Sequence, residues 1–281
     1  MRWPGPAPVS PLVRRVLAPN PGIYTGPGTN TYLIGREQVA IIDPGPAGGP
    51  DDDGHLDRVA AAGAGRIRWI FATHTHPDHS PGAAGLAERT GAEVIGFDAR
   101  DDFEPDTEIG DGWMLATEEF RLRAVHTPGH APNHLCFLLE DERALFSGDH
   151  IMSGSTVVIR PPEGDMTAYM EALGRLETLR PPPLTIATGH GNVIPDPPAK
   201  VQEYVSHRRA REESIFEVVA ATSGVTVEQI VPVVYVGVDD DHQAIARYSV
   251  WAHLRKMAAE GRVAAADVDD MATTWRPAGG R

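Results

Sequence analysis

Apolar and polar residues along the chain alternate in a way that predicts many short strands with helices between them. Apolar runs of strand length, each bounded by turn residues, occur at residues 39–42, 67–72, 94–95, 135–139, 144–146 and 184–188. Residues 120–126 mostly alternate apolar and polar positions, as a half-buried strand does. Helical periodicity is found at residues 55–62, 80–89 and 169–179, and Ser80 is the expected N-cap of the second helix. This pattern predicts sheets covered by helices.

The pattern changes near residue 195. Pro195, Pro197 and Pro198 predict a hinge, after which helical periodicity dominates. Three predicted helices are followed by two short strand-like segments, at residues 262–263 and 274–275, which is a winged-helix pattern. We therefore expect three parts: a Pro-rich segment at residues 1–13, a catalytic domain at residues 14–195, and a helical linker with a winged-helix-like domain at residues 196–281.

Composition and charge limit the partners of the chain. The formal net charge is −14 over 281 residues, which disfavours binding to polyanions over the whole surface. The one basic run, residues 207–211, is followed at once by Glu212 and Glu213, and it predicts a solvated helix face. Cys136 is the single cysteine and lies in an apolar run, so we expect it to be buried and inert.

The expected location is the cytoplasm. No apolar stretch approaches the roughly 20 residues that cross a bilayer, so no membrane association is expected. Residues 1–11 are Pro-rich and lack the apolar segment of a secretion signal.

One segment concentrates residues that bind metals. Directly after the apolar run that ends at Ala72, four such residues fall within six positions: His74, His76, Asp78 and His79. Packed together without a metal, these groups would leave buried polar atoms unpaired, which is costly. Three later apolar runs are each followed by one further ligand-type residue: His130, Asp149 and His190. A polar ligand at the end of each of four strands predicts a metal site.

This order, His-x-His-x-Asp-His followed by His, Asp and His, resembles the metallo-β-lactamase superfamily. The resemblance implies an α/β fold of four layers, αββα, here with a small C-terminal winged-helix domain. It also implies two metal ions and assigns their ligands residue by residue. The first ion takes His74, His76 and His130, the second takes Asp78, His79 and His190, and Asp149 bridges the two.

The expected cofactors are two Zn²⁺ ions, with Mn²⁺ or Fe²⁺ as alternatives. Such a pair shares a hydroxide, which Asp78 would orient as the catalytic residue. Histidine ligands usually need a partner for the other ring nitrogen, and Asp43 and Thr73 are the candidates, with Asn133 and His134 after them. We expect His150 to line the pocket without binding metal. No metal role is expected for the remaining histidines: His55, His126, His207, His242 and His253.

The branch of the superfamily is indicated by three further segments. Asp149 stands where lactamase branches commonly have cysteine, so penicillin hydrolysis is not expected. The Asp bridge and the Thr-Pro-Gly-His turn at residues 127–130 resemble the glyoxalase II-like thioesterases. Residues 26–33 and 146–155, with the predicted winged helix, resemble the lactamase-beta-like protein 2 branch, whose relatives include endoribonucleases that act on single-stranded RNA.

Two functions remain open on the sequence. The first is a dinuclear hydrolase that uses a metal-bridging hydroxide on an ester, thioester or related small acyl substrate. The alternative is a metal-dependent endoribonuclease acting on single-stranded RNA. A phosphodiesterase should carry Lys, Arg or Ser groups near its metals, and Arg160 and Ser155 are the candidates.

Two other classes fit less well. A di-iron redox protein of this fold typically has glutamate where His76 stands and is paired with a flavin domain. A winged-helix regulator without activity would leave the ligand set unexplained. Residues 214–281 hold six basic and nine acidic residues, so we expect this region to pack against the catalytic domain, close the pocket or form a homodimer contact rather than read DNA.

Overall fold

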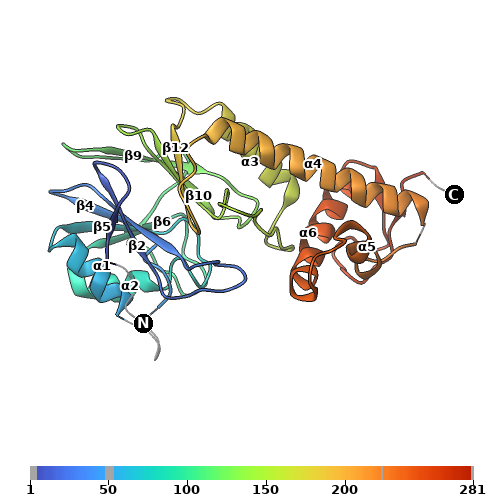
Figure 1. The fold of residues 1–281 in the computed structure, drawn as a ribbon, viewed down its shortest axis with the longest axis horizontal. Helices are drawn as coiled ribbons and strands as arrows, with labels where there is room; N and C mark the ends of the chain where they lie inside the picture. Colours follow the sequence, from blue (N-terminus) through green and yellow to red (C-terminus); the bar gives the residue numbers. More distant parts are fainter. Residues whose placement is uncertain (1–4, 48–53, 223, 280–281) are drawn as a thin grey trace. The chain divides into compact units, whose positions relative to one another are not determined.

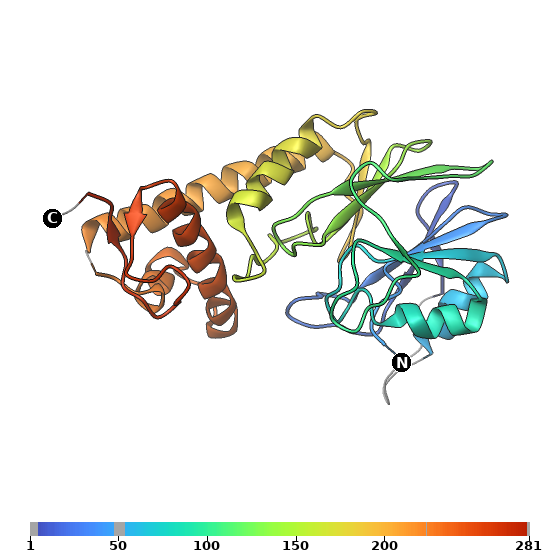
Figure 2. The ribbon, with the colours of Figure 1, turned by 180° about the vertical axis from the view of Figure 1, so that it is seen from behind.

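The computed structural model describes residues 5–47, 54–222 and 224–279, so small parts of all three predicted segments lie outside the described residues. The described chain divides into two compact units (Figures 1 and 2). The first comprises residues 1–127, 133–156 and 178–197, and the second comprises residues 128–132, 157–177 and 198–281. None of the described helices is both long enough and apolar enough for a membrane crossing.

The first unit contains a seven-stranded sheet. Its order follows the chain: β1 (Ala7–Pro8), β2 (Val13–Leu17), β3 (Asn30–Ile34), β4 (Val39–Ile42), β5 (Ile67–Phe71), β6 (Glu93–Gly96) and β7 (Thr107–Glu108). The strands are antiparallel up to β4 and parallel from β4 to β7. Parallel strands end at the same edge of a sheet, which places the segment after β5 beside the ends of β4 and β6.

A second sheet has five strands. Their order is β12 (Thr185–Thr188), β11 (Ala144–Gly148), β10 (Leu135–Leu139), β9 (Arg121–His126) and β8 (Met114–Ala116). The pairing is antiparallel except between β11 and β12, which run parallel. The carboxyl ends of β11 and β12 therefore lie side by side, and each is followed by a predicted metal ligand.

Two apolar layers hold these elements together. Between the sheets, Tyr32 and Phe71 from one sheet join Phe137 and Phe146 from the other in one buried cluster. On the other face of the first sheet, α1 (His55–Gly63) and α2 (Gly82–Thr90) add apolar side chains to a second cluster. Both helices lie on the same side of that sheet in Figure 1. Each Å² of apolar surface removed from water stabilises the fold by about 25 cal/mol, which makes this packing the main stabilising contribution.

The second unit is mainly helical. Its elements are α3 (Met166–Glu177), α4 (Pro197–Ala221), α5 (Val227–Val234), α6 (Asp240–Ala259) and the β13 (Val263–Ala264) and β14 (Arg276–Pro277) hairpin. Thr226 begins α5 with a capping box that includes Gln229. Ile215, Leu254 and Trp275 are fully buried in the core that α4, α5, α6 and the hairpin share.

The predicted start of the second helix differs from the structure. Ser80 is not a helix cap: α2 begins at Gly82 with Pro81 in the N-cap position, and the Ser80 side chain is buried. Its backbone N–H instead bonds to the carbonyl of His76, in the turn that ends the ligand segment. Pro197 and Pro198 lie in the first turn of α4, where a missing backbone N–H costs nothing, and the boundary between the two units falls between them.

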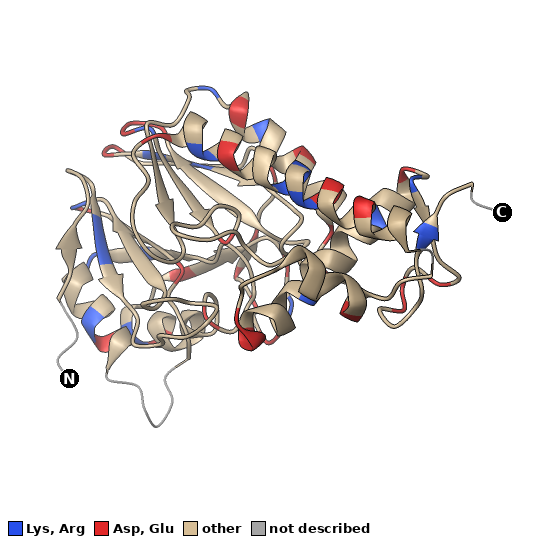
Figure 3. Ribbon diagram, turned by 45° about the vertical axis from the view of Figure 1, so that its right-hand side comes forward, with Lys and Arg blue, Asp and Glu red and all other residues tan. Residues whose placement is uncertain are grey.

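The basic run at residues 207–211 is only partly solvated. Figure 3 shows basic and acidic residues interleaved along α4, as the sequence predicted. Arg208, however, is only 2% exposed. Its guanidinium donates to the carbonyl of Val157 and stacks over the ring of Tyr169, 5.2 Å from the ring centroid. This contact joins residues 51 positions apart, which the helical pattern of the run does not show.

Candidate metal centre

The ligand-rich segment is a tight turn between β5 and α2. The N–H of His79 donates to the carbonyl of His76 at 3.0 Å, which folds the segment back on itself. His74 and His79 are buried, whereas the Asp78 side chain retains 24% exposure. The segment thus offers buried imidazoles and one carboxylate that solvent can reach.

The parallel pair of β11 and β12 brings two more ligand types to the same place. Asp149 directly follows β11, and His190 comes two residues after β12. The N–H of Gly189 donates to the carbonyl of Gly148 at 2.9 Å, which fixes the two strand ends together. Residues 41 positions apart in sequence therefore present their side chains to one point.

Four side chains converge there. The Nε2 atom of His79 lies 3.3 Å from Nε2 of His190 and 3.4 Å from both Asp78 Oδ2 and Asp149 Oδ1. His190 Nε2 lies 3.1 Å from Asp78 Oδ2 and 3.3 Å from Asp149 Oδ1. These separations suit atoms that share a cation, because ligands about 2.0–2.2 Å from zinc stand roughly 3–3.5 Å from one another.

His74 and His76 lie beside this group. The Nε2 atom of His74 is 2.9 Å from Nδ1 of His76. One ligand atom each of His74, His79 and Asp149 also lies within 4.8 Å of the others. His130 belongs to the second unit, where its Nδ1 lies 2.8 Å from the carbonyl oxygen of Val158, so its partnership with His74 and His76 stays a prediction.

The outer ring nitrogens of the histidines are held by protein groups. His79 Nδ1 lies 2.8 Å from Asp43 Oδ2, and His74 Nδ1 lies 3.1 Å from Thr73 Oγ1. Asp43 also accepts from Thr73, at 2.7 Å from the backbone N–H and 2.9 Å from the hydroxyl. The predicted contacts of Asp43 and Thr73 with these rings are therefore present. When Nδ1–H donates outward, the Nε2 lone pair remains for a metal.

One such partner was missed by the sequence reasoning. His190 Nδ1 lies 3.2 Å from the carbonyl oxygen of Gly28, 162 residues earlier in the chain. Every residue has a backbone carbonyl, so only the glycine-rich segment near Gly28 could have drawn attention to it. Asn133, by contrast, contacts no ligand histidine through its amide nitrogen, which donates to Thr75 and Asp98.

Opposite charges within the site shift the pKa values of its groups against the effect of burial. Burial would raise the pKa of Asp149, but His79 and His190 hold it well below its usual value. Burial likewise opposes the charge of His190, yet Asp149 and Asp78 raise its pKa to about 9. The pKa of His79 is raised well above its usual value, because three carboxylates outweigh burial. A bound cation would replace these protons, since metal ligands must be deprotonated.

Two glycines leave room for this arrangement. A Cβ on Gly189 would lie 2.8 Å from Asp149 Oδ1 and 2.9 Å from Cε1 of His79. Gly148 has a φ of +45°, and a Cβ there would lie 2.6 Å from Thr73 Oγ1. The donor set of imidazoles and carboxylates, held from outside and packed on glycines, fits divalent metal ions of the zinc, manganese and iron type.

The other histidines and Cys136 have different surroundings. His150 is buried and belongs to none of the ligand groups found among the described residues. Cys136 is fully buried, and burial raises the pKa of its thiol to about 12, in line with the inert role expected for it. His253 is buried against Glu212, and burial lowers its pKa to about 4.

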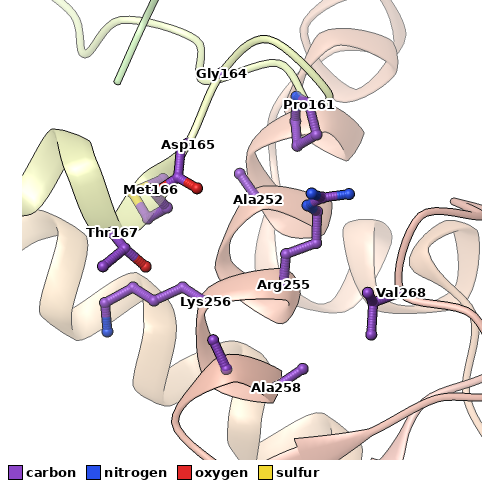
Figure 4. A pocket seen from close by; sticks show the side chains of 11 residues that line it. Pro161, Gly164, Asp165, Met166, Thr167, Ala252, Arg255, Lys256, Ala258 and Val268 are labelled. Carbon is purple, nitrogen blue, oxygen red and sulfur yellow. The ribbon is translucent and has the colours of Figure 1, made fainter. Parts of the chain in front are cut away.

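A separate cavity of about 360 Å³ lies within the second unit (Figure 4). The close view shows the side chains of Arg255 and Lys256, from α6, among those that line it. Arg255 forms an ion pair with Asp269, and Lys256 forms ion pairs with Glu212 and Glu260. The predicted candidate Arg160 stacks over Tyr248 in this unit, 4.5 Å from the ring centroid. The cations of this cavity are thus neutralised by neighbouring carboxylates.

Comparison with known proteins identifies the class. Residues 24–190 match the family described as the metallo-beta-lactamase superfamily, and residues 226–275 match the beta-lactamase associated winged helix domain. The chain belongs to the metallo-β-lactamase superfamily and carries this winged-helix domain at its C-terminal end. Both the predicted family and the predicted fold class are confirmed.

Individual relatives indicate the branch of the superfamily. A beta-lactamase-like protein 2 homolog from Drosophila melanogaster is 33% identical over 267 residues, covering 89% of this chain and 89% of its own. An atrochrysone carboxyl ACP thioesterase from Aspergillus chevalieri is 34% identical over 243 residues, covering 83% of this chain and 76% of its own. The predicted resemblance to the lactamase-beta-like protein 2 branch is therefore confirmed.

Solved structures support the same fold. A metallo-beta-lactamase family protein from Thermus thermophilus aligns with a TM-score of 0.79 at 20% identity, covering 96% of this chain and all of its own. A beta-lactamase domain protein from Burkholderia ambifaria aligns with a TM-score of 0.80 at 20% identity, covering 97% of this chain and 93% of its own. At this identity the likeness concerns the fold alone.

Proposed function

We propose that this protein is a dinuclear metal-dependent hydrolase that cleaves a thioester or ester of a small acyl substrate. The observation that carries the proposal is the convergence of two imidazole Nε2 atoms and two carboxylates within 3.1–3.4 Å, with both outer ring nitrogens held by Asp43 and Gly28. Such a set leaves its lone pairs directed at one point, which is what a metal centre requires.

Seven residues would hold the two ions. We propose that one ion takes His74, His76 and His130, the other takes Asp78, His79 and His190, and Asp149 contacts both. Two bound divalent ions would lower the pKa of a water molecule and neutralise the negative charge that develops on the carbonyl oxygen. Zinc is the ion that this ligand set suits first, with manganese or iron as alternatives.

Asp78 is the proposed catalytic residue. Neighbouring His79 and His190 lower the pKa of Asp78 against the effect of burial, so its carboxylate is ionised at neutral pH and can accept a hydrogen bond. With 24% of its side chain exposed, it can also reach a water molecule that enters from solvent. Asp78 would accept a hydrogen bond from the attacking water and so orient its oxygen toward the acyl carbon. As that oxygen adds, the bond from the acyl carbon to the leaving sulfur or oxygen would break, and the proton given up by the water would depart with the leaving thiol or alcohol.

The substrate class is proposed from the relatives and from charge. One similar protein is named an acyl carrier protein thioesterase, and thioesters have a good leaving group. The formal net charge of −14 disfavours a long polyanion such as RNA. We therefore place small acyl thioesters and esters ahead of single-stranded RNA, which stays a comparison substrate in the test.

The test measures metal-dependent turnover on a panel of substrates. Protein loaded with zinc or manganese would be assayed on an acyl N-acetylcysteamine thioester, the matching oxoester, a lactone and a labelled single-stranded RNA. We expect hydrolysis of the thioester or ester, loss of activity on chelation, and loss of activity in Asp78→Asn. The matched control is Asp57→Asn, because Asp57 lies on α1 with a 74% exposed side chain that pairs with Arg89.

Two outcomes would overturn the proposal. RNA cleavage that disappears in Asp78→Asn, without acyl hydrolysis, would assign the site to a ribonuclease. A protein that binds fewer than two ions per chain in wild type would remove the dinuclear site itself.

A further inference from the structure

Four buried polar groups lie beneath the end of β11, next to the metal centre but outside its ligand set. They are Thr127, His134, Cys136 and Ser147, and each is fully buried. His134 directly precedes β10 and Cys136 lies in it, Thr127 directly follows β9, and Ser147 lies in β11. All four lie in the first unit. Buried polar groups are almost always hydrogen-bonded, so each of these four should have a partner.

The contacts form a chain that starts at Asp149. The backbone N–H of Asp149 donates to Nε2 of His134 at 3.1 Å, and Nδ1 of His134 lies 2.9 Å from the hydroxyl oxygen of Thr127. That hydroxyl lies 3.3 Å from the sulfur of Cys136, whose thiol donates to the carbonyl of Ser147 at 3.7 Å. This chain of hydrogen bonds therefore begins at Asp149 and ends at Ser147, two positions away at the end of the same strand.

The direction of every bond follows from the first one. A backbone N–H can only donate, so Nε2 of His134 must be the acceptor and the ring proton of the neutral imidazole lies on Nδ1. Nδ1–H then donates to Thr127, which leaves the hydroxyl proton for the sulfur of Cys136 at 3.3 Å or the carbonyl of His134 at 3.5 Å. The raised pKa of Cys136, about 12, keeps that thiol protonated and able to donate to Ser147. Each ring nitrogen of His134 thus has one role that it can fill.

We propose that His134 is a positioning residue that fixes the backbone at Asp149 and so aims its carboxylate between His79 and His190. The proposal rests on the proposed metal centre, because it assigns His134 a role in holding a ligand of that centre. A neutral ring with the proton on Nδ1 is the form that the geometry requires, and the backbone N–H of Asp149 is the group that selects it.

The packing around Gly148 leaves no room for a side chain at this position. Gly148 has a φ of +45°, and a Cβ there would lie 2.8 Å from Nε2 of His134 and 2.6 Å from Thr73 Oγ1. Thr73, the partner of His74, and His134 therefore both pack closely against Gly148. This packing fixes the peptide that leads into Asp149, and the direction of the Asp149 side chain follows from that peptide.

Two substitutions of His134 test the contacts of its two ring nitrogens one at a time. In His134→Gln the amide oxygen can reach the place of Nε2 and accept from Asp149. In His134→Asn the shorter amide reaches only the place of Nδ1, so it keeps the Thr127 side and loses the Asp149 side. Thr127→Val leaves the ring in place but removes its Nδ1 partner. His253→Gln is the matched control, since His253 is equally buried but belongs to the second unit.

The first readout is the tautomer, measured in metal-free wild type by long-range proton–nitrogen NMR of the histidine rings. We expect the His134 proton on Nδ1 in wild type and also in Thr127→Val, because the backbone N–H of Asp149 still needs Nε2 as its acceptor. The second readout is metal affinity from competition with a chromophoric chelator. We expect His134→Asn to weaken one ion by about 10- to 100-fold, as removal of an outer partner commonly does, while His134→Gln and His253→Gln stay near wild type.

Several results would overturn the inference. An Nε2–H tautomer in wild type contradicts the hydrogen-bond chain, whatever the function of the protein is. A folded His134→Asn variant that binds both ions as wild type does contradicts the positioning role. If wild type itself binds fewer than two ions, the proposed metal centre fails instead, and the tautomer measurement still tests the chain.

Discussion

Replacing Asp43 by asparagine tests the metal centre from outside its ligand set. Asp43 is 2% exposed and accepts three hydrogen bonds, from the backbone and hydroxyl of Thr73 and from Nδ1 of His79. Its φ of +54° lies in the left-handed region, which asparagine tolerates well, so the change introduces no new backbone strain. The substitution alters one atom and one charge in a fixed place.

The amide has only one orientation that keeps Thr73 satisfied. Its oxygen must accept the Thr73 N–H, because the opposite orientation would set two donors against each other. The amide nitrogen then takes the place of Oδ2, where it faces both the Thr73 hydroxyl, which must turn to accept, and His79 Nδ1. Donation to Nδ1 moves the ring proton to Nε2. A protonated Nε2 cannot bind metal, so binding must first restore the original tautomer.

The magnitude follows from this reversal. Loss of an outer partner typically weakens metal binding about 10- to 100-fold, which equals about 1.4–2.7 kcal/mol. The upper end is expected here, because the lost bond joins a carboxylate to a buried imidazole at 2.8 Å, and such charge-assisted bonds are the stronger ones.

The assay is competition for metal with a chromophoric chelator, followed by turnover at saturating metal. We expect Asp43→Asn to bind one ion more weakly and to regain most of its turnover when metal is in excess. Asp57→Asn, on the exposed face of α1, is the control and should bind both ions as wild type does. Wild-type affinity in a folded Asp43→Asn protein would refute the argument that Asp43 sets the tautomer of His79.

Further predictions concern other parts of the molecule. Gly189→Ala places a Cβ 2.8 Å from Asp149 Oδ1, so elemental analysis should show loss of bound metal, and turnover should fall with it. Asp149→Ala should lose at least one ion and all turnover; an active variant with two ions would refute the proposed bridging role. Cys136→Ser should keep its turnover, because a hydroxyl can replace the thiol between Thr127 and Ser147; a folded but inactive variant would contradict this. The pKa of His253, about 4 in the folded protein and about 6.5 when unfolded, means that the unfolded chain takes up the proton first. Stability should therefore fall by about 3 kcal/mol as the pH drops from 6.5 to 4, and in urea titrations His253→Gln should lack this part of the pH dependence.

The sequence alone determined the kind of site and the order of its parts. Apolar runs ending in His74, Asp149 and His190 predicted that ligands lie at strand ends, and the structure brings those strand ends together. The winged-helix pattern could also be predicted, because three amphipathic helices and a short hairpin are local features. These predictions succeed because they depend on periodicity and on residue type, both of which are visible within a few neighbouring positions.

Only the tertiary structure decided which atoms of those residues are available. The carbonyl of Gly28 lies against His190 across 162 residues, and the N–H of Asp149 lies against His134 across 15 residues. Arg208 is buried although its neighbours along α4 predicted an exposed run. Either ring nitrogen of a histidine can bind a metal, and the one left for it is set by what the other one touches. That contact comes from elsewhere in the chain, so it is a property of the packed structure and not of any local pattern.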